Sequence, residues 1–150
     1  MKLADFINAE GQERIAQAIT QAEKHTSGEI CVHVTSKCRG DIMKMAEHKF
    51  NKLRLYNTLQ RNAVLVLIAY ESRKFAIIGD QGINKVVPSN FWDSEKNTLL
   101  AYLKEGQVVE GLCQIIAQMG NSLKSYFPCQ DNDVNEIDNA VTFDEEDDEA

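Results

Sequence analysis

Hydrophobic and polar positions alternate along this chain with two different periods, and the periods predict the order of its helices and strands. Apolar residues three and four positions apart predict helices over residues 8–25 and 42–54. Asn8 and Asp41 stand where short polar side chains cap a first helical turn. Strict alternation of apolar and other residues predicts a strand between these helices, over residues 29–36.

The middle of the chain is predicted to form a hairpin of two strands. Residues 63–69 are a continuous apolar run of strand length, which is typical of a strand buried on both faces. A polar turn over residues 71–73 leads into a second strand, 74–78. Helical segments are predicted after the hairpin: a short helix over 83–87, a segment capped by Ser89 that runs to Leu103, and a last helix over 107–125.

This order of elements predicts an α/β fold, a three-layer α/β/α sandwich around a central mixed sheet. The strand–helix–strand connection makes the first two strands parallel, and the hairpin makes the third antiparallel to the second. The chain has 150 residues, 43% of them hydrophobic, which suffices for one domain with its own core. We expect the domain to span residues 1–140 and residues 141–150 to form a disordered acidic tail, because like charges in a block repel one another.

Charge and composition exclude several classes of function. The net charge of -7 makes nucleic acid an unfavourable partner, since a nucleic-acid-binding face needs clustered Lys and Arg. We recognise no leader sequence and no apolar stretch of the ~20 residues that span a bilayer, so we expect a cytoplasmic protein without a membrane span. We also expect a monomer. The four cysteines are scattered without a C-x-x-C pair, which favours reduced structural thiols over a zinc site. The three histidines form no metal-binding pair, and His33 is placed on the strand face opposite Val32 and Val34.

Three short polar motifs flank the predicted strands. Residues 26–29 precede the first strand, residues 61–62 precede the second, and residues 79–82 follow the third. In the predicted topology the starts of the first two strands and the end of the third lie at the same edge of the sheet. We therefore expect five polar side chains to converge there: Ser27, Glu29, Arg61, Asn62 and Asp80.

Asp80 is the strongest candidate for a functional residue, because it lies in a glycine-flanked turn at a strand end, where ligands commonly bind in α/β proteins. Its carboxylate suits Ca²⁺ or Mg²⁺, and the alternative is a turn aspartate that bonds its own backbone. Glu29 is a second metal ligand, a general base, or a solvated residue at a strand start. Arg61 either binds an anion such as phosphate or neutralises a neighbouring carboxylate. Ser27 and Asn62 offer neutral oxygens to the same cleft.

A second acidic segment, residues 131–138, is rich in oxygen ligands. Its opening copies that of a calcium-binding loop, but Glu136 replaces the required glycine and Thr142 replaces the required glutamate, so an EF-hand is rejected. The segment can still fold back over the sheet edge and contribute Glu136 or Asp138 to a cation site.

The same polar motifs resemble the TPM domain, a family that includes thylakoid acid phosphatase-like proteins, photosystem II repair proteins and receptor modulators. The resemblance covers residues 1–140 and is carried, in order, by residues 26–30, 61–65, 78–83, 91–92, 126–128 and 135–139. It implies an α/β sandwich with helices on both faces of a sheet. It also implies a divalent cation, often calcium, in an acidic cleft. Weak acid phosphatase activity is attributed to plant members, and other members act as assembly or repair factors.

Two functions follow as hypotheses. The first is a cation-responsive interaction or assembly module, in which the ion fixes the polar loops and presents a surface to a protein partner. The second is a metal-dependent acid phosphatase that acts on a phosphorylated small molecule. In that case Asp80, with Glu29 or Glu136, holds an ion that activates water, and Arg61 holds the phosphate. We favour the first, because the sequence supplies no convincing nucleophile and base.

Overall fold

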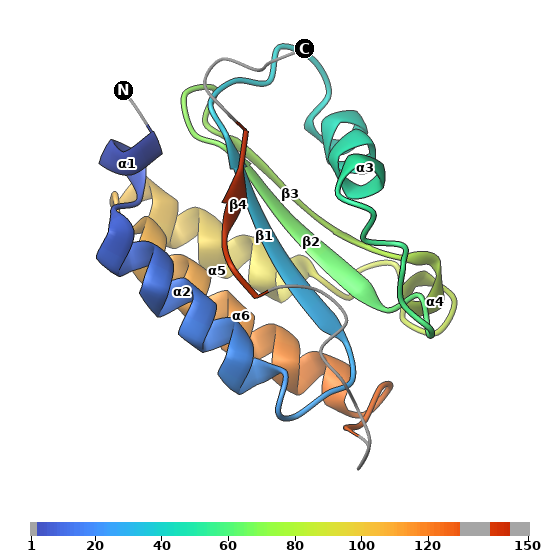
Figure 1. Cartoon of the computed structure of the whole chain (residues 1–150). Helices are drawn as coiled ribbons and strands as arrows, with labels where there is room; N and C mark the ends of the chain where they lie inside the picture. Colours follow the sequence, from blue (N-terminus) through green and yellow to red (C-terminus); the bar gives the residue numbers. More distant parts are fainter. Residues whose placement is uncertain (1–2, 130–138, 145–150) are drawn as a thin grey trace.

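The computed structural model describes residues 3–129 and 139–144. They fold into three layers, with one sheet between two layers of helices (Figure 1). The elements in chain order are α1 (Leu3–Phe6), α2 (Ala9–Ala22), β1 (Glu29–Thr35), α3 (Ile42–Lys52), β2 (Ala63–Ala69), β3 (Lys74–Gly79), α4 (Gln81–Asn84), α5 (Asp93–Lys104), α6 (Val108–Lys124) and β4 (Thr142–Phe143).

The described sheet has four strands in the order β3-β2-β1-β4. β1 pairs with β2 in parallel, with Glu29 opposite Ala63, and β2 pairs with β3 in antiparallel, with Val64 opposite Gly79. The predicted parallel pairing of the first two strands and the predicted hairpin are both confirmed. Strands β1 and β2 are buried at every position, as expected for strands covered on both faces.

Two hydrophobic cores lie on opposite faces of this sheet. The larger core joins α2, α5 and α6 to one face, and its centre includes Val66, Ile77 and Leu112. The smaller core joins α3 to the other face through Ala46 and Phe50, against Leu65. Figure 1 shows this arrangement, with α3 on one side of the strands and the three long helices on the other. The predicted α/β/α sandwich around a mixed sheet is therefore confirmed. In the described part of the chain, no helix is long and apolar enough to cross a membrane.

Most predicted helices are present, and two predicted starts are wrong. Asn8 and Asp41 cap α2 and α3 as expected, each accepting a backbone N–H of the first turn. The short helix predicted over 83–87 lies instead at Gln81–Asn84, because the carboxylate of Asp80 accepts the N–H of Gln81 and starts the helix earlier. Ser89 does not cap α5, which begins at Asp93 after an irregular turn.

The C-terminal boundary of the domain also differs from the prediction. Residues 141–144 are not a disordered tail: Val141 is 9% exposed, and Thr142 and Phe143 form β4, opposite His33 and Val34 of β1. These residues complete the sheet at the edge where β1 would otherwise be unpaired. The rest of the expected tail, 145–150, lies outside the described residues.

A buried ionic cluster holds β4 in place. The carboxylate of Asp144 lies 2.8 Å from the Lys49 ammonium of α3 and 3.0 Å from Nε2 of His33, and all three side chains are at most 8% exposed. Burial lowers the pKa of His33, and Asp144 only partly opposes this effect, so the imidazole is neutral at pH 7. Burial alone would raise the pKa of Asp144, but hydrogen bonds from Lys49 and Thr35 hold it below its usual value. His33 lies on the predicted face of its strand, opposite to Val32 and Val34. Its burial in this ionic cluster was not predicted.

Candidate functional site

Three of the predicted site segments meet at one edge of the sheet, as expected. Glu29 of β1 lies opposite Ala63 of β2, and the N–H of Asp80 donates to the carbonyl of Ala63 over 2.9 Å. These three residues therefore form one row across the ends of β1, β2 and β3. Because side chains alternate along strands and both Cys31 and Ile78 belong to the α3-side core, Glu29 and Asp80 face the α3 side as well. Both carboxylates are buried, with 4% and 7% of the residue exposed.

Asp80 is held by a bidentate ion pair with Arg61. Nε of Arg61 donates to Oδ2 of Asp80 over 2.7 Å, and Nη2 donates to Oδ1 over 3.0 Å. Hydrogen bonding to Asp80 raises the pKa of Arg61. Of the two roles expected for Arg61, neutralising a carboxylate is the one the geometry supports, since the Nε–Nη2 edge of its guanidinium is occupied by Asp80. Asp80 also fills the role of a turn aspartate, because its side chain caps α4.

The backbone around Arg61 is shaped to make this pair. Arg61 has a φ of 51°, in the left-handed region that non-glycine residues rarely adopt. Its carbonyl accepts the N–H of Gly82 over 2.9 Å. A Cβ at Gly82 would lie only 2.1 Å from the carbonyl oxygen of Gln60, so only glycine allows the two loops to approach this closely. The Gly79–Gly82 motif thus brings Asp80 within reach of Arg61.

Ser27 and Asn62 form a second polar group at the same edge. Oγ of Ser27 accepts hydrogen bonds from Nδ2 of Asn62 at 3.3 Å and from Nε2 of Gln60 at 3.1 Å. Asn62 is 1% exposed, and its Oδ1 has no hydrogen-bond partner among the described residues. A buried carbonyl oxygen without a donor or a cation is costly, by roughly 1–3 kcal/mol. Ser27 has no neighbouring base in these contacts, and nothing in them activates it as a nucleophile.

Glu23 belongs to this region and was not predicted. It ends α2, and its Oε2 accepts the N–H of Ile30 on the outer edge of β1 over 2.9 Å. Burial raises the pKa of Glu23 to about 8, and the nearby Glu29 carboxylate adds to the shift. One sequence signal could have revealed Glu23. An acidic side chain at a helix C-terminus interacts unfavourably with the helix dipole, which suggests that a tertiary contact holds it there.

The remaining predicted ligands are not tested by these contacts. Glu136 and Asp138 lie outside the described residues, so their distance from Asp80 is not established. Within residues 3–129 and 139–144, no group of three or more His, Cys, Asp or Glu side chains is arranged to hold a metal ion. The described part of the site thus offers two buried carboxylates, one of them paired with Arg61, and the neutral oxygens of Ser27 and Asn62.

Comparison with known proteins identifies the family. The protein-family comparison matches the TPM domain over residues 1–122. The chain belongs to the TPM-domain family. A solution structure of BA42 from the psychrophilic bacterium Bizionia argentinensis is similar to this TPM domain, with 38% identity, a TM-score of 0.89, and coverage of 95% of this chain and 99% of that one.

A more distant structure shares the fold of this TPM domain. It is the N-terminal domain of cg2496 from Corynebacterium glutamicum, which is 17% identical with a TM-score of 0.63, over 83% of this chain and 78% of that one. Comparison with curated protein sequences found no match. The resemblance to the TPM domain predicted from the sequence motifs is therefore confirmed, while these relatives assign no residue to a metal or a substrate.

Proposed function

We propose that this TPM domain binds a divalent cation, Ca²⁺ or Mg²⁺, beside the first residues of β1 and β2 and acts as a cation-responsive interaction or assembly module. The observation that carries the proposal is the buried Oδ1 of Asn62, which has no partner in the described residues. The amide nitrogen of the same side chain donates to the Ser27 hydroxyl over 3.3 Å. Carbonyl, hydroxyl and carboxylate oxygens are the ligands that these hard cations prefer. Glu29, buried at the start of the neighbouring strand, supplies negative charge.

Arg61 acts in this proposal as an internal competitor for the cation. Its guanidinium already neutralises Asp80, so Asp80 can join a cation site only when Arg61 is displaced. Arg61 is 38% exposed on its side chain and can swing into solvent, whereas Asp80 is anchored at the start of α4. Cation binding would thus change the loop that carries Arg61 and the loop over residues 79–84. A protein partner would recognise the changed conformation of these two loops.

The proposal is tested by titrating the protein with Ca²⁺ and with Mg²⁺ while recording ¹⁵N–¹H spectra. We expect shifts centred on the amides of Gly28, Asn62, Gly79 and Gly82, which surround the proposed site. Shifts confined to the acidic residues 145–149 would mean that the C-terminus alone attracts cations, and the proposal would fail.

Removing the internal competitor should tighten cation binding. In Arg61→Gln the Asp80 carboxylate loses its counter-ion, and we expect the affinity for Ca²⁺ to rise about tenfold. Arg73→Gln is the matched control, because Arg73 has a similar φ of 56° and lies in the exposed hairpin turn. Calorimetric titration measures both variants. Equal affinities for the two variants would show that Arg61 does not compete with the cation.

The phosphatase hypothesis is less well supported by the geometry. It requires Arg61 to hold a phosphate, and the Nε–Nη2 edge of its guanidinium already lies on Asp80, which neutralises its charge. The contacts of Ser27 are to amide groups, which cannot accept its proton as a general base would. We therefore place cation-responsive binding ahead of hydrolysis.

A further inference from the structure

Strand β3 presents an open backbone edge. It is the outermost strand of the described sheet on the side opposite β4. Because the N–H of Asp80 bonds to β2, alternation places the backbone N–H and C=O groups of Phe75 and Ile77 on the outer side of β3. Neither backbone has a partner on that side among the described residues. Further along, the Asn84 side chain donates to the outward carbonyl of Gly79 over 3.0 Å and ends the open edge.

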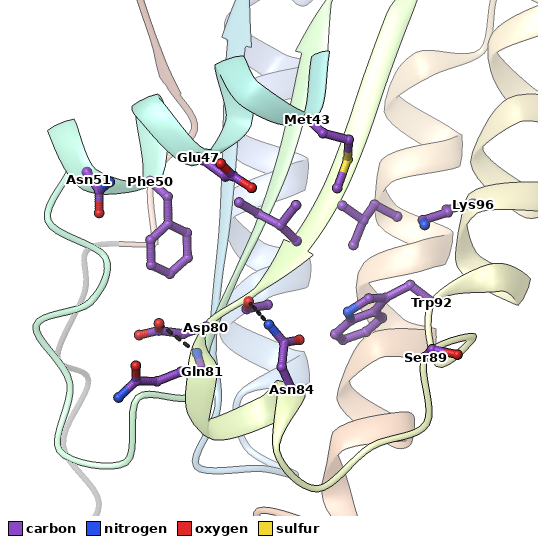
Figure 2. A pocket seen from close by; sticks show the side chains of 13 residues that line it. Met43, Glu47, Phe50, Asn51, Asp80, Gln81, Asn84, Ser89, Trp92 and Lys96 are labelled. Carbon is purple, nitrogen blue, oxygen red and sulfur yellow. Dashed lines mark hydrogen bonds between the residues drawn. The ribbon is translucent and has the colours of Figure 1, made fainter. Parts of the chain in front are cut away.

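This edge lies at the floor of a groove between α3 and α5, here called the β3 groove. Two hollows of about 510 and 870 Å³ follow the edge, the first beside Ile77 and Gly79 and the second beside Lys74 and Phe75. Figure 2 shows the first, with α3 on one side and the start of α5 on the other. The α3 wall offers the apolar residues Ile42, Met43 and Phe50. The α5 wall repeats every fourth residue: Trp92, Lys96, Leu100 and Lys104.

Trp92 carries a second, independent sign of a ligand. Its ring lines the groove and is 7% exposed, yet its Nε1–H has no acceptor among the described residues. Figure 2 shows the indole reaching into the hollow from the α5 side, beside Lys96. Trp normally finds an acceptor for this N–H when it is buried. The groove therefore has an unsatisfied donor on its α5 side, where Lys96 also supplies positive charge.

We propose that the β3 groove binds an extended segment of a partner protein, which adds to the sheet beside β3 with acidic side chains toward α5 and apolar side chains toward α3. This inference rests on the proposed role in protein interaction and not on the cation site. Strand addition uses main-chain hydrogen bonds for affinity and alternate side chains for specificity. Lys96 and Lys104 select the acidic face of the segment, and its backbone or carboxylate oxygens accept from Trp92.

A second copy of this chain fits the groove less well. Antiparallel pairing of two β3 edges would bring α5 of one copy against α5 of the other, and place Lys96 and Lys104 beside the same residues of the partner. Like charges brought together in this way disfavour association. The helices that form both walls also admit a single extended chain more readily than another sheet edge with its own flanking helices.

The probe is a capped nine-residue peptide that alternates valine and glutamate, compared with the same peptide carrying lysine in place of glutamate. We expect the glutamate peptide to bind about tenfold more tightly. The amide signals of Phe75 and Ile77 and the indole N–H signal of Trp92 should move downfield as they gain acceptors. If neither peptide moves these signals, or if the lysine peptide binds as well, the proposal is overturned.

Strand addition is separated from other binding by N-methylation of the glutamate peptide. Alternate residues of a strand point their N–H groups to opposite edges, so methylating one alternate set should abolish binding while methylating the other set leaves it intact. Equal effects of the two sets would exclude pairing with β3.

Two variants test the groove walls. Lys96→Glu should weaken binding of the glutamate peptide about fivefold. Lys24→Glu is the control, because Lys24 is exposed and follows α2, far from the groove. Helix α2 packs against α6, on the side away from α5. Trp92→Phe keeps the aromatic packing and removes the donor, and should weaken binding about fivefold without lowering Tm. Unchanged binding in both Lys96→Glu and Trp92→Phe would overturn the proposal.

The groove and the cation site can fail separately. The glutamate peptide is titrated once with EDTA and once with Ca²⁺. Peptide binding without any cation-induced shift at Asn62 would support the groove and refute the cation site. Cation-induced shifts at Asn62 without peptide binding in either condition would refute the groove alone.

Discussion

Asp144→Ala is expected to lower the free energy of unfolding by about 3–5 kcal/mol, the loss typical of breaking a buried ion pair. The Asp144 carboxylate lies 2.8 Å from the Lys49 ammonium, and the two side chains are 8% and 6% exposed. Without Asp144 the ammonium stays buried with no counter-ion, and His33 loses its second hydrogen-bond partner. Urea unfolding at pH 7 measures the change.

Two comparisons make this result specific. Glu110→Ala breaks the Arg14–Glu110 pair, whose distance is 2.7 Å but whose side chains are 48% and 54% exposed, and should change the stability much less, because solvent screens the pair. Adding Lys49→Met to Asp144→Ala removes the stranded charge while keeping the shape of the side chain, and should recover much of the loss. If Asp144→Ala were as mild as Glu110→Ala, β4 would not be part of the folded domain.

Glu23→Gln is expected to stabilise the protein by about 3 kcal/mol at pH 8 and to have little effect near pH 4.5. The pKa of Glu23 is raised from 4.5 to about 8 in the folded protein, mainly by burial. The folded state therefore holds a proton that the unfolded chain releases between these two pH values. Stability should fall as the pH rises through this window and should level off above about pH 8. Glutamine stays neutral throughout and still offers a carbonyl oxygen to the N–H of Ile30.

The slope of stability against pH is the decisive measurement for Glu23. Between pH 6.5 and 7.5 the wild-type protein should lose about 1 kcal/mol relative to Glu23→Gln, in EDTA to exclude cations. His33 acts in the opposite direction, since its lowered pKa reduces stability only as the pH falls below its ordinary value of 6.5. Glu13→Gln, an exposed change on the same helix, is the control and should leave the wild-type slope unchanged. A wild-type slope equal to that of Glu23→Gln would mean that Glu23 is ionised in the folded protein.

Local sequence patterns were sufficient to predict the helices and strands in which those patterns are strong. Residues 63–69 and 74–79 form the expected hairpin, because a continuous apolar run and a polar turn admit few alternatives. Asn8 and Asp41 cap helices because capping depends on only a few neighbouring residues. The meeting of Arg61 and Asp80 also followed from the strand order, since parallel and antiparallel pairing fix which strand ends share an edge.

The burial of polar residues and the identity of their partners depend on contacts between distant parts of the chain. Lys49 and Asp144 are 95 residues apart in sequence, and His33 and Asp144 are 111 apart, so no local spacing reveals these contacts. Strand β4 has only two residues, in a short and mostly apolar run over 140–143 that an acidic segment follows. It forms because the edge of β1 supplies hydrogen bonds and Lys49 supplies a counter-charge to Asp144. Periodicity reports which face of an element is apolar, but the partner of a buried charge depends on how distant elements pack.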